Sequence, residues 1–251
     1  MGRSDYERFR SLTFDDFRRF ATDPSLSIHE KIGFPDEYRQ NRDAAILDDI
    51  VRKAPLLAES RRLVLDIGPG CGALAMRVIA LCRDRQHTLM LADSPEMLQQ
   101  LPDAPFLTKL PGYYPTDTDA SLRPYDGRVD MVLAYSVLHY VHADGNLFPF
   151  VDRSLALQAP GGQLLLGDIP NASKRARFFA SEAGIRFHRA FTGADGTPPV
   201  DDATARDGID DAVVLAILER CRRAGFDAYV VPQPPDLPMA NRREDIVVHR
   251  P

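Results

Sequence analysis

Residues 61–72, RRLVLDIGPGCG, predict how the chain is folded. The apolar run from Leu63 to Ile67 is typical of a short buried strand, and a helical pattern of apolar residues begins at Ala73. Three glycines separate the two, Gly68, Gly70 and Gly72. A strand, a glycine turn and a helix form the nucleotide-binding unit of doubly wound α/β folds, because the glycines admit a ligand to the backbone and the helix N-terminus offers free amides.

Two classes of ligand fit this turn. Gly68-x-Gly70-x-x-Ala73 matches the dinucleotide fingerprint, which tolerates alanine at its third position. Asp66, two residues before the first glycine, instead suits a ligand with a cationic end, such as the ammonium group of a methionine moiety, and would repel a pyrophosphate. A tight turn that binds no ligand is a third interpretation.

The stretch VLDIGPGCG resembles motif I of the class I S-adenosylmethionine-dependent methyltransferases. The resemblance extends over about residues 60 to 250 and also rests on the strand tip at Asp93, the Pro160-Gly161-Gly162 turn and the number of strands. It implies S-adenosylmethionine as the cofactor, bound at Asp66 and the three glycines. It also implies an α/β, Rossmann-like fold: a seven-stranded, mostly parallel sheet with an antiparallel last strand and helices on both faces.

Length and composition predict one large domain with an extension. We expect a helical N-terminal extension at 1–60 and the Rossmann-like domain at 61–251, with a substrate-lining insertion at about 170–208. A net charge of -5 gives no indication of a broad basic surface for nucleic acid. No apolar run is long enough to span a membrane, and the N-terminus has no apolar signal core. Three cysteines without a CxxC pair predict a reducing cytoplasm and no metal site: Cys71, Cys82 and Cys221.

The first 60 residues have phenylalanines at roughly helical spacing and a break at Gly33 and Pro35. We expect an amphipathic helix packed on the domain. In the methyltransferases that the chain resembles, such a segment often closes over the cofactor as a lid, and the resemblance implies that Tyr38 and Arg39 reach the cofactor carboxylate. Surface positions without a function are the alternative for these two residues.

Cofactor contacts are also expected after the second and third predicted strands, 88–92 and 106–110. A carboxylate at a strand tip, here Asp93, can accept two hydrogen bonds from a ribose diol. Ser94 would cap the next helix and place Met97 near the adenine, and the family's adenine loop corresponds to Gly112 and Tyr113. Helix caps and an ordinary turn are the alternatives.

The fourth predicted strand, 129–134, is followed by side chains that can carry chemistry. Catalytic groups of doubly wound folds lie beyond the carboxyl ends of the strands, and the candidates here are Tyr135 and Ser136 for the cofactor and His139 and His142 for catalysis. An oxygen acceptor needs a base with a pKa near neutrality, which favours His139, with His142 on the same helical face. A structural role is the alternative for each histidine. Ala134-Tyr135-Ser136-Val137 is not the Asn/Asp-Pro-Pro-aromatic motif of the nucleic-acid amino-methyltransferases.

A fifth strand, 163–169, should follow the Pro160-Gly161-Gly162 turn. Asp168 and Asn171 at its end are expected to orient the acceptor, with Asp168 as a catalytic candidate. Basic residues in the first turn of a helix capped by Ser173 could bind a phosphate or carboxylate: Lys174, Arg175 and Arg177. A solvated helix face is the alternative. A long connection from Gly184 to Gly208 would line the substrate pocket.

The sequence therefore predicts an S-adenosylmethionine-dependent methyltransferase of small molecules. Four segments, YSVLHYV, GDIPNASKRARFF, YVVPQPPDLPM and NRREDIVV, resemble a bacterial subgroup associated with surface-polysaccharide and sugar-modification gene clusters. That resemblance implies O-methylation of a sugar or a phosphorylated or nucleotide-linked sugar. N-methylation of an amino sugar or small amine, a non-catalytic cofactor-binding partner subunit and an NAD-dependent oxidoreductase are the alternatives. A homodimer is compatible with the sequence.

Overall fold

The computed structural model describes residues 12–35, 41–193, 196 and 208–251. Seven strands form one sheet in the order β3-β2-β1-β4-β5-β7-β6. The strands are β1 (Leu63–Ile67), β2 (Thr88–Asp93), β3 (Leu107–Pro111), β4 (Val129–Tyr135), β5 (Gln158–Pro170), β6 (Asp227–Pro232) and β7 (Arg243–His249). β7 runs antiparallel to both of its neighbours, β5 and β6, while the pairs among β1 to β5 are parallel. The predicted fold class, including the antiparallel last strand, is confirmed.

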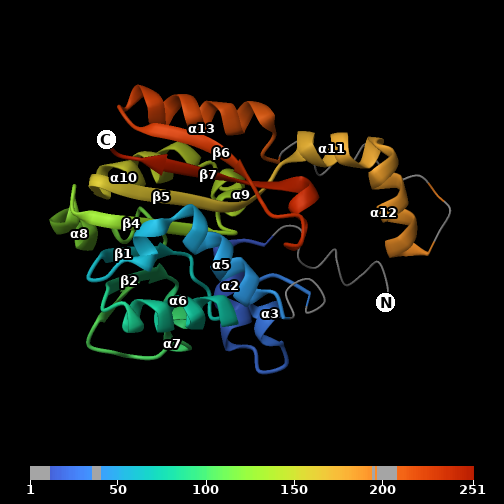
Figure 1. Ribbon diagram of the computed structural model, residues 1–251. Helices are drawn as coiled ribbons and strands as arrows, with labels where there is room; N and C mark the ends of the chain where they lie inside the picture. The colour runs from blue at the N-terminus through green and yellow to red at the C-terminus, as the bar shows by residue number, and fades with distance from the viewer. Residues whose placement is uncertain (1–11, 36–40, 194–195, 197–207) are drawn as a thin grey trace.

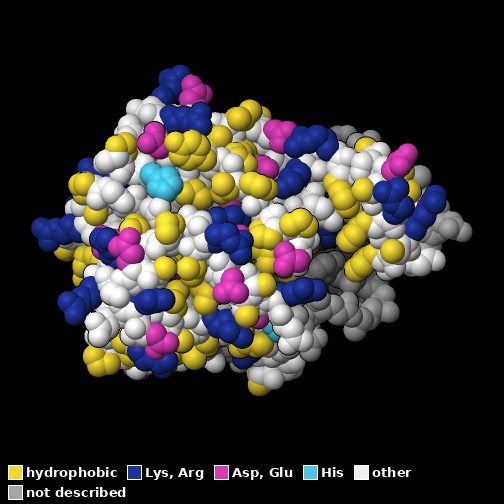
Figure 2. All heavy atoms as spheres, viewed as in Figure 1, with side chains coloured by type: hydrophobic (Ala, Val, Ile, Leu, Met, Phe, Trp, Pro, Cys, Tyr) yellow, Lys and Arg dark blue, Asp and Glu magenta, His cyan; other side chains and the backbone are white. Residues whose placement is uncertain are grey.

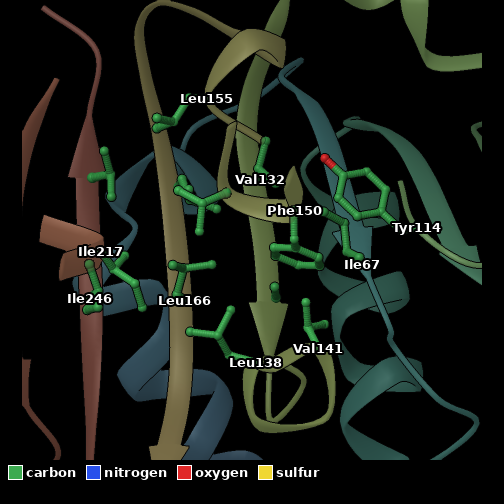
Figure 3. Close-up of a cluster of buried hydrophobic side chains, with 14 of the residues drawn as sticks. Ile67, Tyr114, Val132, Leu138, Val141, Phe150, Leu155, Leu166, Ile217 and Ile246 are labelled. Carbon is green, nitrogen blue, oxygen red and sulfur yellow. The ribbon is translucent and has the colours of Figure 1, made fainter. Parts of the chain in front are cut away.

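Helices cover both faces of the sheet (Figure 1). One face packs against α5 (Asp43–Lys53), α6 (Ala73–Asp84) and α7 (Pro95–Gln99), and the other against α9 (Leu138–Ala143), α10 (Leu147–Leu157) and α13 (Asp211–Arg223). The core on the second face is drawn in Figure 3, where the ring of Phe150 lies among aliphatic side chains from the strands. Phe150 is only 1% exposed, so its burial contributes about 1.5–3 kcal/mol to folding. Short helices α8 (Asp119–Leu122), η1 (Pro55–Ala58), η2 (Arg123–Tyr125) and η4 (Ala240–Arg242) complete the connections.

The strand order places a crevice at the end of β1. The chain goes from β1 to β2 and β3 on one side, and β4 begins the other side of the sheet. Asp66 on β1 is paired with Leu91 on β2 and with Leu133 on β4. Ligands of doubly wound folds bind beyond the carboxyl ends of the strands at this kind of reversal. The glycine turn after β1 therefore lies where a ligand site is expected.

Strand β5 begins earlier than predicted. Val129 pairs with Gln158 and Met131 with Gln163, so residues two positions apart on β4 pair with residues five positions apart on β5. Gly161, with φ of +74°, lies in this irregularity. The predicted turn before the strand is therefore an irregularity within it.

The region after β5 is more helical than the sequence indicated. Helix α11 (Ala172–Ala180) is capped by Asn171 and not by Ser173, because the Asn171 side chain accepts a hydrogen bond from the Lys174 amide at 3.0 Å. Helix α12 (Glu182–Thr192) then replaces the first part of the predicted long connection. Gly184 was predicted to begin a loop, but it lies inside α12. The position takes a glycine because a Cβ there would come within 2.0 Å of the Phe178 carbonyl oxygen. Figure 1 shows α11 and α12 projecting from the body of the molecule.

The described part of the N-terminal extension is helical, as predicted. Helices α2 (Phe14–Thr22) and α3 (Ile28–Lys31) each begin with a capping box, at Thr13 and Ser27. Helix α2 packs against α7, next to the glycine turn. Within the described ranges, no helix has the length and apolar character needed to cross a membrane.

Candidate functional site

A cleft lies at the carboxyl ends of β1, β2 and β4. It encloses about 970 Å³, including its mouth open to solvent. The cleft brings together nine of the predicted cofactor residues: Gly68, Gly70, Gly72, Asp93, Met97, Gly112, Tyr113, Tyr135 and Ser136.

The glycine turn is a position where larger residues do not fit. Gly68 and Gly70 have φ of +68° and +63°, which favours glycine. A Cβ on Gly68 would lie 2.6 Å from the Val137 side chain, and a Cβ on Gly70 would lie 2.7 Å from that of Ile32. The turn is therefore held between Val137, two residues after β4, and Ile32 of the N-terminal extension.

Asp93 joins the tip of β2 to the glycine turn. Its Oδ2 accepts a hydrogen bond from the Gly70 amide at 2.9 Å, and its Oδ1 accepts one from the Ser94 amide at 2.6 Å. Burial raises the pKa of Asp93 to about 6, and these two amides limit the rise. Ser94 is buried and caps α7 by accepting a hydrogen bond from the Met97 amide. Ser94 thus holds the Asp93 carboxylate through its amide, and it is not among the described residues that line the cleft.

Asp66 lies behind the turn. Leu65 and Ile67 belong to the core with α9, α10 and α13, so Asp66 points to the opposite face. Its negative charge helps to raise the pKa of the Cys82 thiol on α6. Burial, and then the charge of Asp93, raise the pKa of Asp66 to about 8. Contact between Asp66 and a ligand stays a prediction.

The carboxyl ends of β4 and β5 meet at Ser136 and Asp168. Both have left-handed backbone conformations, with φ of +61° and +58°, which are unusual for residues other than glycine. The Ser136 hydroxyl donates a hydrogen bond to the Asp168 carboxylate. Ser136 lines the cleft, whereas Asp168 is 4% exposed and lies one hydrogen bond behind it.

The two histidines lie on α9, beyond the described lining of the cleft. The ring of His139 contacts that of Tyr140, with centroids 3.8 Å apart, and Tyr140 lines the cleft. A catalytic role for His139 or His142 stays a prediction.

The predicted acceptor-binding residues are engaged in contacts with the protein itself. Arg177 forms an ion pair with Asp211, and Lys174 donates to the Arg243 carbonyl oxygen. Asn171 donates to Asp211 at 2.8 Å and to Glu244 at 2.6 Å, and the Arg175 guanidinium lies 5.2 Å from the centre of the Phe179 ring. These contacts fasten α11 to α13 and β7, and none of these four predicted residues is among the described residues that line the cleft.

The sequence predicted an N-terminal segment over the cofactor, but not which of its described side chains form the roof of the cleft. Four side chains from α2 and from the residues after α3 line it: Phe14, Phe17, Ile32 and Phe34. Phe14 and Tyr113 form an edge-to-face pair with ring centroids 5.1 Å apart, and Phe17 and Tyr140 form another at 4.8 Å. The helical spacing of the phenylalanines was visible in the sequence, but it indicated only a packed helix. Tyr38 and Arg39 lie outside the described residues.

The charges of the cleft are negative. Asp93 and Asp144 are the only Asp, Glu, Lys, Arg or His residues among the described residues that line it. Tyr113 donates a hydrogen bond to Asp144 at 2.8 Å, and burial followed by this contact raises the Tyr113 pKa to about 12. The described residues also contain no cluster of His, Cys, Asp or Glu that could hold a metal ion. The lining therefore suits a neutral or cationic ligand better than a diphosphate.

Several solved structures with the same fold are named as methyltransferases. The chain aligns with the CurJ carbon methyltransferase (TM-score 0.54, 15% identity, 98% of this chain and 67% of that chain). An O-methyltransferase family protein from Burkholderia thailandensis gives a TM-score of 0.57, with 16% identity over 99% of this chain and 67% of the other. The N-methyltransferase NodS from Bradyrhizobium japonicum WM9, solved with S-adenosyl-l-homocysteine, gives 0.55, with 14% identity over 95% and 98%.

Identities this low establish the shared fold and nothing finer. No family model matches the sequence, and no curated protein matches it.

Proposed function

We propose that the protein is an S-adenosylmethionine-dependent methyltransferase that acts on a small molecule. The observation that carries this proposal is Asp93, a carboxylate at the tip of β2 that is bonded to the Gly70 amide and lines the cleft. The residues present fit the cofactor: Asp93 can accept hydrogen bonds from a ribose diol, the apolar lining near Met97 suits an adenine, and the acidic lining suits cationic groups.

The chain's own residues have distinct tasks in this proposal. When bound, S-adenosylmethionine supplies an activated methyl group. Asp93 orients the ribose, the glycine turn lets the cofactor approach the backbone, and Ser136 lies at the end of β4 where the acceptor is expected. Alignment of the two reactants supplies much of the rate, and the roof formed by α2 and the residues after α3 excludes water as a lid.

For the acceptor we propose a sugar hydroxyl, as the sequence resemblance implies. N-methylation of an amino sugar or small amine is the second candidate, and the absence of Lys and Arg from the described lining favours it over a phosphorylated acceptor. The three cysteines are buried free thiols, in keeping with our proposal of a reducing cytoplasm.

The test is calorimetric titration of the purified protein with S-adenosylmethionine, S-adenosylhomocysteine and NAD. We expect both sulfur nucleosides to bind and Asp93→Ala to abolish that binding. Asp130→Ala is the control, because it removes a carboxylate near the start of β4, at the end of the strand that is remote from the cleft. Binding of NAD alone would refute the proposal. Binding without methyl transfer to any sugar or amine in a screen would favour the partner-subunit alternative.

An oxygen acceptor needs a base to remove its proton, whereas a free amine needs less help of this kind, and His139 is the proposed base. Once an acceptor is known, His139→Ala should lower kcat by about 100-fold or more and leave cofactor affinity unchanged. His142→Ala is the matched comparison on the same helix. Full turnover by His139→Ala would remove His139 from the mechanism.

A further inference from the structure

Gly167 lies at a strand position whose backbone accepts any residue. It is inside β5, and it is not one of the glycines with a positive φ. A glycine inside a strand weakens it, and such a position often marks the close approach of another group. Here that group is the ring of Tyr135 on β4, because a Cβ on Gly167 would lie 2.3 Å from the Cδ2 and 2.8 Å from the Cε2 of the ring. The ring therefore lies in the space that a side chain at position 167 would occupy.

The preceding pair on the same face of the sheet shows what the glycine permits. Tyr135 pairs with Gly167, and Leu133 pairs with Leu165. Both leucines are buried, and they belong with Tyr135 to the core that packs against α5 and α6. Two branched side chains thus fit side by side at the first pair, whereas at the second pair one aromatic ring reaches from β4 over β5.

A hydrogen bond keeps β4 and β5 together beside the ring. The Ser136 amide donates to the Gly167 carbonyl oxygen at 2.9 Å, so the strands do not separate freely at this point. Tyr135 is 9% exposed, which means that packed protein surrounds most of its side chain. A methyl group added at Gly167 must therefore displace the ring, and displacement inside a packed region is costly.

Tyr135 is also part of the cleft wall. Ser136 and Val137 line the cleft next to it, so the ring belongs to the side of the cleft that the end of β4 forms. Gly167 is not among the described residues that line the cleft. A change at Gly167 would thus alter the shape of the cleft only through the ring of Tyr135.

We propose that Gly167 positions the Tyr135 ring, and that the ring in this position shapes the β4 side of the cleft for the methionine end of S-adenosylmethionine. The inference rests on the proposed function, in which Asp93 at the end of β2 orients the ribose and the adenine lies near Met97 on the following helix. Strand β1 separates β2 from β4, so the methionine end of the cofactor then lies on the β4 side. Gly167 is a positioning residue, since it acts through Tyr135.

The experiment is a double-mutant cycle measured by calorimetric titration with S-adenosylhomocysteine, so no acceptor is required. Gly167→Ala should weaken binding by about tenfold, because the added methyl group forces the ring from its place. In a Tyr135→Leu background the same change should weaken binding by less than about twofold, since no ring is left to displace. In a Tyr135→Phe background the ring remains, so the loss of about tenfold should return.

Two controls separate the position of the ring from the stability of the fold. Gly161→Ala adds a methyl group near the other end of β5, where no described atom lies within 4 Å of the Cβ position. Its φ of +74° makes this change destabilising, yet it should leave the affinity unchanged. Adenosine lacks the methionine end, so Gly167→Ala should weaken adenosine by less than about twofold.

Equal weakening by Gly167→Ala in the unaltered and Tyr135→Leu backgrounds would overturn the inference. An unchanged affinity in Gly167→Ala, or an equal loss for adenosine, would do the same and leave the proposed function intact. If Gly167→Ala does not fold, Tyr135→Leu alone should weaken S-adenosylhomocysteine by about tenfold, and a loss below about twofold would contradict the role of the ring. Failure of the unaltered protein to bind S-adenosylmethionine and S-adenosylhomocysteine would overturn the proposed function as well.

Discussion

Two constraints, a positive φ and a lack of space for a Cβ, require glycine at position 70, and a comparison with Gly145 can separate their effects. Its φ of +63° strains any residue with a Cβ, and the Ile32 side chain occupies the space where that Cβ would lie. Gly145 has nearly the same conformation, with φ of +71°, but nothing lies within 4 Å of its Cβ position. Backbone strain therefore acts at both positions, whereas steric overlap acts only at Gly70.

We expect Gly70→Ala to cost clearly more stability than Gly145→Ala. The strain alone costs about 1–2 kcal/mol, and overlap with Ile32 adds to it. Gly70→Ala should also abolish cofactor binding, which Gly145→Ala should leave unchanged. Urea unfolding and calorimetry measure the two effects. Equal destabilisation by both variants would show that Ile32 moves away freely.

We predict that the Asp66 carboxyl releases a proton when the cofactor binds. Its pKa of about 8 means that it is mostly protonated at pH 7 in the free protein, and an ammonium group nearby would stabilise its charged form. We therefore expect proton release at pH 7 and weaker binding as the pH falls below about 8. Titrations in buffers of different ionisation enthalpy measure the protons. Asp66→Asn should abolish the release, and an unchanged release would place the ammonium elsewhere.

The predicted site residues that lie together at one edge of the sheet share one property: the sequence signals that point to them are local. Asp66, the glycines and Asp93 stand at fixed positions relative to predicted strand ends, and the topology then brings them to one edge of the sheet. The contacts of Lys174 and Arg177 could not be foreseen, because their partners lie in β7 and α13. A basic first turn indicates an anionic partner, but it does not distinguish a ligand from another part of the chain.

At the scale of elements, α2 is both a structural helix and part of the site. Phe17 pairs with Tyr140, while Arg18 on the same helix forms an ion pair with Glu96 on α7 at 2.8 Å. The sequence predicted the helix from its apolar period, which shows that a face is buried. The period cannot show whether that face meets a sheet, another helix or a ligand cleft.

Phe17→Leu should speed dissociation of S-adenosylhomocysteine by roughly 2- to 10-fold, because an edge-to-face aromatic pair contributes about 0.5–1.5 kcal/mol. Stopped-flow displacement measures the rate. Phe191→Leu, on exposed helix α12, is the control and should have no effect. A rate unchanged by Phe17→Leu would mean that the roof does not limit ligand exit.

At the scale of the whole molecule, Lys53 connects the N-terminal part of the chain to the last strand through Asp245. These two residues are 192 positions apart, so no local pattern in the sequence could predict their contact.

The surface of the molecule also has an apolar part. Phe187 and Phe191 are exposed on the projecting helix α12, where Figure 2 shows hydrophobic side chains beside basic ones.

Lys53→Met should cost about 3–5 kcal/mol of stability at pH 7, since it leaves Asp49 and Asp245 buried without their cation. Burial raises the pKa of Asp245, so its protonation at lower pH should reduce this cost. Arg52→Met removes another cation that contacts Asp49, but an exposed one, and should cost no more than about 1 kcal/mol. Guanidinium unfolding at pH 5 and pH 7 tests both expectations.

The position of β7 has a consequence for synthesis on the ribosome. β6 lies at the edge of the sheet and pairs with β7, which is made after it and inserts between β6 and β5. During translation β6 therefore has no strand to pair with until residues 243–249 leave the exit tunnel. Until then the edge of β5 that pairs with β7 is also unpaired. Those residues also include Arg243, which donates to the Asp168 carboxylate at 2.8 Å, and Asp245, which pairs with Lys53, so the charges behind the cleft come together only when the sheet closes. A nascent chain with six strands in place would still lack the electrostatic environment of its own site.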